Sequence, residues 1–167
     1  FTNKNGNNPK DSWKWLKENF TSLAHYLEPF KEKASKRTDK GDYWWELRSC
    51  NYYAEFEKPK IVYLVFQVKP AFTFDPSGNF YVNNAVWTIP KNDYYLLGIL
   101  NSKLGWLLIS NYCTQIQNGY QLIFQYLGKI PIYTIDFEKP DDKTRHDRMG
   151  TLVTEMLELH KYLRNAK

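Results

Sequence analysis

Cysteine is scarce in this sequence, and no long apolar run is present. Only two of the 167 residues are cysteines, Cys50 and Cys113, which is too few for a disulfide framework. No stretch of about 20 apolar residues could cross a bilayer, and no signal peptide opens the chain. These absences favour a cytoplasmic protein whose thiols are structural, and they argue against a secreted or membrane protein.

A recognisable catalytic apparatus is also missing. The eight glycines are dispersed among turns, so no phosphate-binding loop is present. The histidines His25, His146 and His160 lie far apart on helical stretches without the spacing of metal ligands. Asn8-Pro9-Lys10 only begins like the N-P-P-Y motif of amino-methyltransferases. The sequence therefore predicts a non-catalytic fragment without a metal site.

Aromatic residues and positive charge are abundant instead. The chain has 13 Tyr, 10 Phe and 6 Trp, and its 23 Lys and Arg outnumber 18 Asp and Glu, which gives a net charge of +5. With 43% hydrophobic residues there is enough apolar material for a core, and most of the rings should lie in it. The positive charge is compatible with an anionic partner, although charge alone does not specify one.

The order of hydrophobic periodicities predicts an α+β fold. Apolar residues three and four apart predict a helix or a broken pair of helices over 13–30, with Thr21 or Ser22 capping the second segment and a kink at Pro29. Strands are expected at 61–66, 86–89, 120–127 and 130–135, a hairpin at 72–74 and 80–82, and helices at 93–110, capped by Asn92, and 142–165. This order predicts a mixed, mostly antiparallel sheet region flanked by helices, with a long C-terminal helix.

The first residues differ in character from the rest. They are polar, and the chain begins at Phe1 without an initiator Met. We therefore expect residues 1–12 to be a linker, residues 13–167 to form one domain, and the whole to come from a longer protein.

Basic residues concentrate after the first helical stretch. Between residues 31 and 69, nine Lys or Arg stand against six Asp or Glu. Lys and Arg neutralise phosphates, and Arg can also fork onto the O6 and N7 atoms of guanine. A basic helix end that complements the helix dipole, or an ion pair of Arg48 with Glu46 or Glu55, would explain the same residues without DNA. The candidate contacts in this region are Lys36, Arg37, Trp44, Arg48, Lys60, Gln67 and Lys69.

An uncharged, amide-rich stretch is the second candidate feature. No charged residue occurs from Leu104 to Gly128, yet the stretch contains six Asn or Gln residues. Their side chains can bond bidentately to the N6 and N7 atoms of adenine. A turn at Asn118-Gly119 with merely exposed amides is the alternative. The candidate base contacts are Gln115, Gln117, Asn118, Tyr120 and Gln121, with Asn83 and Asn84 as a further pair.

Several segments, in this order, resemble the TaqI-like C-terminal specificity domain. The resemblance covers roughly residues 22–163, and its most specific parts are the K-P-K-I-V strand at 58–62 and the L-N-S-K-L helix at 100–104. The other parts are 27–31, Arg37, 40–48, the hairpin at 74–81, 96–99, 130–132 and 146–159.

The resemblance implies a target recognition module that binds double-stranded DNA and reads base edges, largely from the major groove. It also implies a Rossmann-like methyltransferase domain of the same chain, upstream of Phe1, which uses S-adenosylmethionine and flips an adenine out of the duplex for N6 methylation. Some members add a nuclease domain. The expected function is DNA recognition for a bacterial restriction-modification enzyme or adenine methyltransferase, with no cofactor in this fragment.

Three alternatives stay open at this point. Trp44, Trp45, Tyr52 and Tyr53 could form the stacking platform of a carbohydrate-binding module. The apolar stripe of the C-terminal helix could be the seam of a protein-interaction domain. A specificity subunit of a multi-subunit system would differ mainly in lacking a catalytic domain on the same chain.

Overall fold

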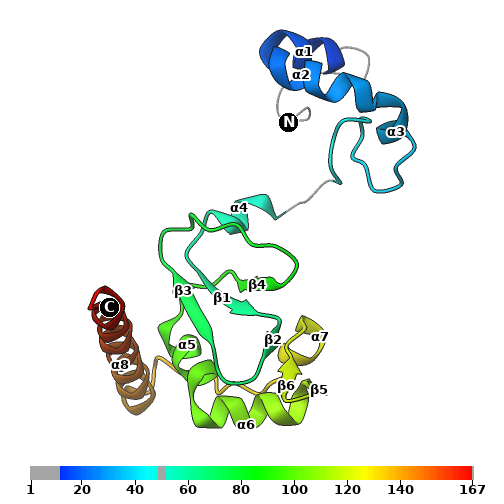
Figure 1. Ribbon diagram of the computed structural model, residues 1–167. Helices are drawn as coiled ribbons and strands as arrows, with labels where there is room; N and C mark the ends of the chain where they lie inside the picture. Colours follow the sequence, from blue (N-terminus) through cyan, green and yellow to red (C-terminus); the bar gives the residue numbers. More distant parts are fainter. Residues whose placement is uncertain (1–11, 49–51, 167) are drawn as a thin grey trace. The chain divides into compact units, whose positions relative to one another are not determined.

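The computed structural model describes residues 12–48 and 52–166, and the chain divides between residues 51 and 52 into two compact units (Figure 1). We call residues 12–48 the N-terminal unit and residues 52–166 the C-terminal unit. Cys50 lies outside the described residues. Cys113 is a buried free thiol of the C-terminal unit, as predicted for a structural cysteine, and burial raises its pKa.

The N-terminal unit is helical. It contains α1 (Ser12–Asn19), α2 (Thr21–Leu27), the 3-10 turn η2 (Glu28–Phe30) and α3 (Lys31–Ser35). Pro29 lies in η2, so the predicted interruption is confirmed. The predicted cap is wrong: Phe20 is the N-cap residue of α2, and the Thr21 hydroxyl donates to the carbonyl of Lys17 (2.8 Å) because the chain continues almost directly from α1.

The C-terminal unit contains two small antiparallel sheets. The strands are β1 (Lys60–Leu64), β2 (Phe66–Gln67), β3 (Phe72–Asp75), β4 (Val86–Ile89), β5 (Thr114–Ile116) and β6 (Gly119–Gln121), in the orders β3-β1-β4 and β2-β6-β5. The predicted strand 61–66 is therefore two strands. Val65 separates them, since its N–H donates to the carbonyl of Ala85 (3.0 Å) in the first sheet and its carbonyl accepts from Leu122 N–H (2.6 Å) beside the second.

The helices of this unit are α4 (Tyr53–Phe56), α5 (Tyr94–Asn101), α6 (Lys103–Tyr112), α7 (Phe124–Leu127) and α8 (Pro140–Asn165). The predicted helix 93–110 is broken at Ser102, whose Oγ caps α6 by accepting from Gly105 N–H (2.9 Å). Asp93 caps α5 by accepting from Leu96 N–H (2.8 Å), so the prediction of Asn92 is wrong by one residue. The long C-terminal helix is confirmed.

Two predicted strands, 80–82 and 130–135, are absent, and a third, 120–127, is shorter than predicted. Residues 80–82 form no hairpin with β3: β3 pairs with β1 instead, and Phe80 N–H donates to the Asp75 side chain at the end of β3 (3.2 Å). The predicted strand 120–127 ends at Gln121, and the chain then turns into α7. Residues 130–135 are irregular, and the hydroxyl of Tyr133 donates to the Asp142 carboxylate of α8 (2.9 Å), which anchors this segment to a helix rather than to a sheet.

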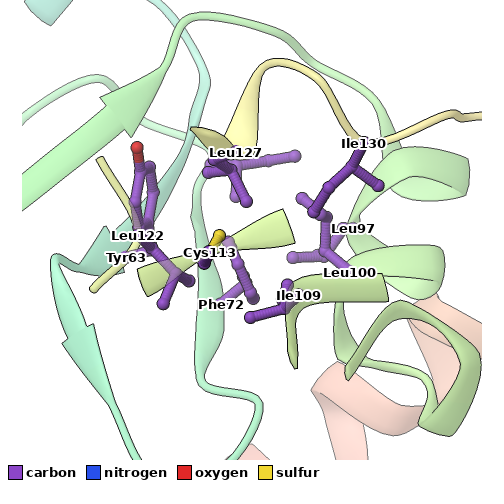
Figure 2. Close-up of a cluster of buried hydrophobic side chains, with 10 residues drawn as sticks. Tyr63, Phe72, Leu97, Leu100, Ile109, Cys113, Leu122, Leu127 and Ile130 are labelled. Carbon is purple, nitrogen blue, oxygen red and sulfur yellow. The ribbon is translucent and has the colours of Figure 1, made fainter. Parts of the chain in front are cut away.

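The core of the C-terminal unit lies between β1, β3 and the helices α5 and α6 (Figure 2). Val153 and Leu157 of α8 pack against it, while Gly98 of α5 lets α8 approach closely, because an added Cβ would lie 2.7 Å from Met149 Sδ. The arrangement confirms an α+β fold with antiparallel sheets flanked by helices. The buried cluster consists of Ile61, Tyr63, Phe72, Leu97, Leu100, Ile109, Cys113, Leu122, Leu127 and Ile130.

Candidate nucleic-acid interface

The N-terminal unit carries four of the candidate residues, and they differ in availability. Arg37 is partly buried, and its guanidinium donates to the carbonyl of Glu46 (2.6 Å), so it holds the loop that follows α3. Trp44 is also partly buried, with its ring 4.7 Å from that of Trp13. Lys36 is exposed and pairs with Glu32 (2.8 Å), a weak surface interaction that a phosphate could replace. Arg48 is exposed as well.

Two predicted contacts, Lys60 and Gln67, are buried in the C-terminal unit. Lys60 is 0% exposed, and its ammonium donates to Asp75 Oδ2 (2.6 Å) and to the carbonyl of Phe56 (2.6 Å). Gln67 is 3% exposed, and its amide accepts from Ala71 N–H (2.9 Å) and donates to the Leu64 carbonyl (3.2 Å). Only exposed side chains can enter a DNA groove, so the structure removes both residues from the predicted set.

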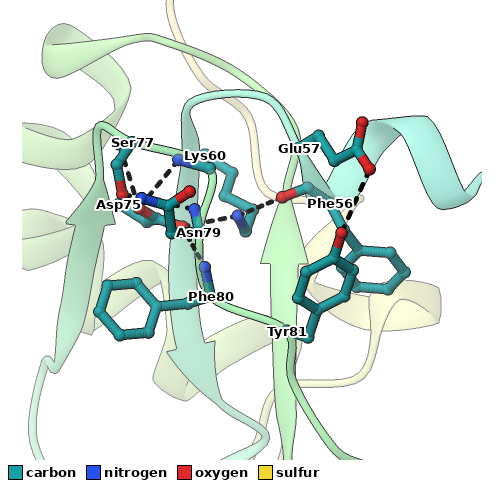
Figure 3. A network of polar contacts seen from close by, with 9 residues as sticks. Phe56, Glu57, Lys60, Asp75, Ser77, Asn79, Phe80 and Tyr81 are labelled. Atoms are coloured by element: carbon teal, nitrogen blue, oxygen red, sulfur yellow. Dashed lines mark hydrogen bonds and ion pairs between the residues drawn. The ribbon is translucent and has the colours of Figure 1, made fainter.

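Asp75, the partner of Lys60, organises the loop after β3 (Figure 3). Its Oδ1 accepts from Ser77 N–H (3.1 Å), Ser77 Oγ (2.9 Å) and Gly78 N–H (3.1 Å), and its Oδ2 accepts from Phe80 N–H (3.2 Å). Gly78 is required here: its φ is +68°, and an added Cβ would lie 2.2 Å from the carbonyl oxygen of Glu57. The result is a rigid loop over a buried ion pair.

The same contacts determine how Asp75 titrates. Burial by itself would raise its pKa, but the hydrogen bonds from Lys60, Ser77 and Phe80 N–H outweigh burial and hold the pKa well below the usual range. Because the folded-state pKa is depressed, the ionised carboxylate stabilises the fold above the unfolded-state pKa of about 4. That stabilisation is lost as the pH falls from there through the folded-state pKa.

We therefore expect the free energy of unfolding to decrease between ~pH 5 and ~pH 3 while Asp75 stays ionised in the folded state. Urea unfolding at both pH values measures the decrease, and carbon-13 NMR of the Asp75 carboxyl group reports its ionisation. A carboxyl signal that titrates near pH 4 in the folded protein would contradict the assignment.

The middle of the amide-rich stretch forms the β5–β6 hairpin, between α6 and α7. Ile116 pairs with Gly119, so the turn consists of Gln117 and Asn118 and lies one residue earlier than the predicted Asn118-Gly119. Gly119 is the first residue of β6 and is buried. It packs so closely against β2 that an added Cβ would lie 2.5 Å from the carbonyl oxygen of Gln67. Gln115, Gln117 and Asn118 are exposed.

Val65 brings the second amide pair close to this hairpin. Ala85, which follows Asn83 and Asn84, is bonded to one side of Val65, and Leu122, which follows Gln121, is bonded to the other. The backbones of Ala85 and Leu122 are therefore two strand spacings apart, which corresponds to roughly 10 Å. Asn83 and Asn84 are exposed, and the Asn83 side chain accepts from Ala85 N–H (3.0 Å). We call the exposed and half-exposed amides of this region, Asn83, Asn84, Gln115, Gln117, Asn118 and Gln121, the amide surface.

The two other candidates differ in exposure. Tyr120 is half-buried, and its ring packs edge-on against Trp106 of α6, with 5.4 Å between the centroids. It therefore packs the hairpin onto α6 and does not project into solvent. Lys69 is exposed beyond β2. Of the predicted set, the structure thus leaves Lys36, Arg48, Lys69 and the amide surface accessible.

A row of exposed apolar residues was missed by the sequence analysis. Leu64, Phe66 and Val68 alternate in sequence with Val65 and the buried Gln67, and all three are exposed. The stretch 61–66 is uniformly apolar, so its hydrophobicity gave no sign of which residues face solvent. Only the pairing register of β1 and β2 shows which residues of this stretch face solvent and which are buried.

The described residues contain neither a metal-binding cluster nor a membrane-spanning helix. Across 12–48 and 52–166, no three His, Cys, Asp or Glu side chains gather in a cluster that could hold a metal ion. Within the same ranges, none of the helices combines the length and the apolar character needed to span a membrane.

Comparison with known families places most of the chain in one family. The family model described as the TaqI-like C-terminal specificity domain matches residues 11–132, well over half of the chain. The matched region includes α1 to α7, every predicted contact residue and both sheets, and it ends before α8. The chain therefore belongs to the family of TaqI-like C-terminal specificity domains.

Proposed function

We propose that this chain is the sequence-specific DNA recognition domain of a bacterial restriction-modification enzyme or N6-adenine DNA methyltransferase, working in the cytoplasm. The family match carries the proposal. Catalysis, with S-adenosylmethionine as methyl donor, would belong to a separate methyltransferase domain, and double-stranded DNA would be the partner of this one. A specificity subunit acting with separate catalytic chains is the closest variant of the same function.

The amide surface supports this role through its shape and chemistry. The major groove of B-DNA, about 12 Å wide, admits two β-strands, and β5–β6 is a short hairpin of the sheet β2-β6-β5 with exposed amides at its turn. Asn and Gln can bond to adenine, while apolar side chains such as Leu64 and Phe66 can contact thymine methyl groups. Exposed Lys36, Arg48 and Lys69 suit contacts to phosphates, which position the domain without reading sequence.

Two of the four rings of the carbohydrate-binding alternative pack against other rings. The rings of Tyr43 and Trp45 stack on each other (5.5 Å between centroids, 11° between planes), and Trp44 packs against Trp13. Trp44 and Trp45 therefore contact neighbouring rings within the N-terminal unit, whereas Tyr52 and Tyr53 are exposed in the C-terminal unit. A protein-interaction role stays a second candidate, because α8 exposes Leu152, Met156, Leu159 and Leu163 along one stripe.

Salt dependence of DNA binding tests the proposed function. We expect the chain to bind mixed-sequence duplex DNA, with the logarithm of affinity falling linearly against the logarithm of salt concentration, by about 0.9 per phosphate contact. Fluorescence anisotropy over a salt series measures the slope. Lys69→Ala should make the slope shallower by about 0.9, the contribution of one phosphate contact. Lys161→Ala, at the far end of α8, is the matched control and should leave the slope unchanged. Absence of binding at low salt by a chain that circular dichroism reports as folded would refute the proposal.

A further inference from the structure

Gln117 has an unusual backbone conformation. Its φ is +53°, and among the described residues it is the one non-glycine residue with a positive φ. This left-handed region costs a side-chain-bearing residue about 1–2 kcal/mol relative to right-handed backbone. Glycine or asparagine normally occupies it. Such strained residues are concentrated at functional sites, because only function or a rigid surrounding keeps them.

The packing of Gly119 explains why the strain falls on this position. The one glycine of the hairpin lies beside Phe66 and the Gln67 carbonyl, where an added Cβ would be 2.7 Å and 2.5 Å from the nearest atoms. It therefore cannot move into the turn without changing the register of β6. Packing fixes where the turn lies, but it does not require the turn residue itself to be glutamine.

The hairpin has one amide that supports the turn, on Gln115 of β5, and one that is available, on Gln117. Gln115 Nε2 donates to the backbone carbonyl of Gln117 (3.4 Å), which braces the strained turn. Within the described part of the chain, the amide of Gln117 itself has no hydrogen-bond partner, and its residue is exposed. A glutamine at the turn of a hairpin, with both its amide donor and its amide acceptor available, has the pattern that pairs with adenine N7 and N6.

We infer that Gln117 is a specificity-determining residue that reads an adenine in the major groove, with Gln115 as its positioning residue. This inference rests on the proposed function and deepens it, because it assigns one base preference to one side chain. It does not depend on which other residues of the amide surface contact DNA.

The test selects binding sites from a randomised duplex pool with the 167-residue chain and with Gln117→Gly. Glycine suits a positive φ, so this variant should fold at least as stably as the natural chain while lacking the amide. We expect it to lose about 5- to 150-fold of the discrimination for one A·T position and to keep its affinity for mixed-sequence DNA. Gln117→Glu should shift that position toward cytosine, whose N4 donates to a carboxylate. Gln125→Ala, an exposed amide on α7, is the control and should change neither.

The outcomes separate this inference from the proposed function. If the natural chain selects a site and Gln117→Gly selects the same site with equal discrimination, the inference is overturned and the proposed function stands. If Gln117→Gly weakens binding to all sequences equally, the residue has a structural role and the inference is also overturned. If the natural chain enriches no sequence, the proposed function fails together with the inference.

Discussion

Replacing Asp75 with alanine should lower the free energy of unfolding of the C-terminal unit by about 3–5 kcal/mol. The substitution removes the acceptor of five hydrogen bonds, from Lys60, Ser77 (backbone and hydroxyl), Gly78 and Phe80. It also leaves the ammonium of Lys60 buried without a counter-charge, since this side chain is 0% exposed. A loss of this size is a large fraction of the total stability of a domain, about 5–15 kcal/mol.

Urea unfolding followed by tryptophan fluorescence and circular dichroism measures this loss. Ser77→Ala is the matched control: it removes one hydrogen bond to Asp75 and an exposed one from Asn79 N–H, and it should cost only about 1 kcal/mol. If Asp75→Ala does not fold at all, Lys60→Met keeps the measurement possible: it retains the apolar stem and leaves Asp75 with its other donors, so its loss should be smaller. Equal and small losses for Asp75→Ala and Ser77→Ala would mean that the ion pair is not a structural centre of this unit.

Gly105→Ala should destabilise the same unit by about 3 kcal/mol, the upper end for overpacking. An added Cβ would lie 2.0 Å from the carbonyl oxygen of Ile99. This neighbour is backbone in the last turn of α5, so it cannot rotate away as a side chain would, and either the α5–α6 turn or the cap at Ser102 has to give way.

The same substitution at Gly150 should have the opposite sign. Gly150 lies within α8, and an added Cβ would meet nothing within 4 Å. Gly150→Ala should therefore stabilise the protein by about 0.5–1 kcal/mol through helix propensity. Thermal unfolding of the two variants side by side measures the contrast. If both substitutions changed the stability in the same direction, helix propensity, and not the close contact with Ile99, would determine the effect of Gly105→Ala.

Much of the fold was predictable from local signals. The helix α8, the strand 86–89 and the interruption at Pro29 each depend on residues close in sequence, and the structure agrees with them. The break at Ser102 was not predictable, because the apolar spacing continues through it and only the approach of Gly105 to Ile99 reveals two helices. The hairpin turn was misplaced by one residue for a related reason, since Gly119 is held by packing against β2 rather than by turn geometry.

The candidate site was predictable in chemistry but not in exposure. The amides of the β5–β6 hairpin are accessible as residue type and turn signals suggested. Lys60 and Gln67 were chosen by the same reasoning, yet both are buried. For Lys60, the sequence beside the strand gives no local sign that the side chain will form a buried ion pair with an aspartate 15 residues later. Burial of polar side chains is a property of tertiary pairing, and no periodicity within one segment encodes it.

The division of the strands between two sheets has a consequence for how this protein can evolve. The buried ion pair and its rigid loop belong to β3-β1-β4, whereas the exposed amides at the hairpin turn belong to β2-β6-β5, and Val65 links the two. Substitutions at Gln117 or Asn118 therefore leave the side-chain contacts of β3-β1-β4 unchanged, whereas Gln115 also braces the turn. A lineage can explore new target sequences at these positions with little risk to stability, so that preferences for DNA sites diverge faster than the fold that carries them.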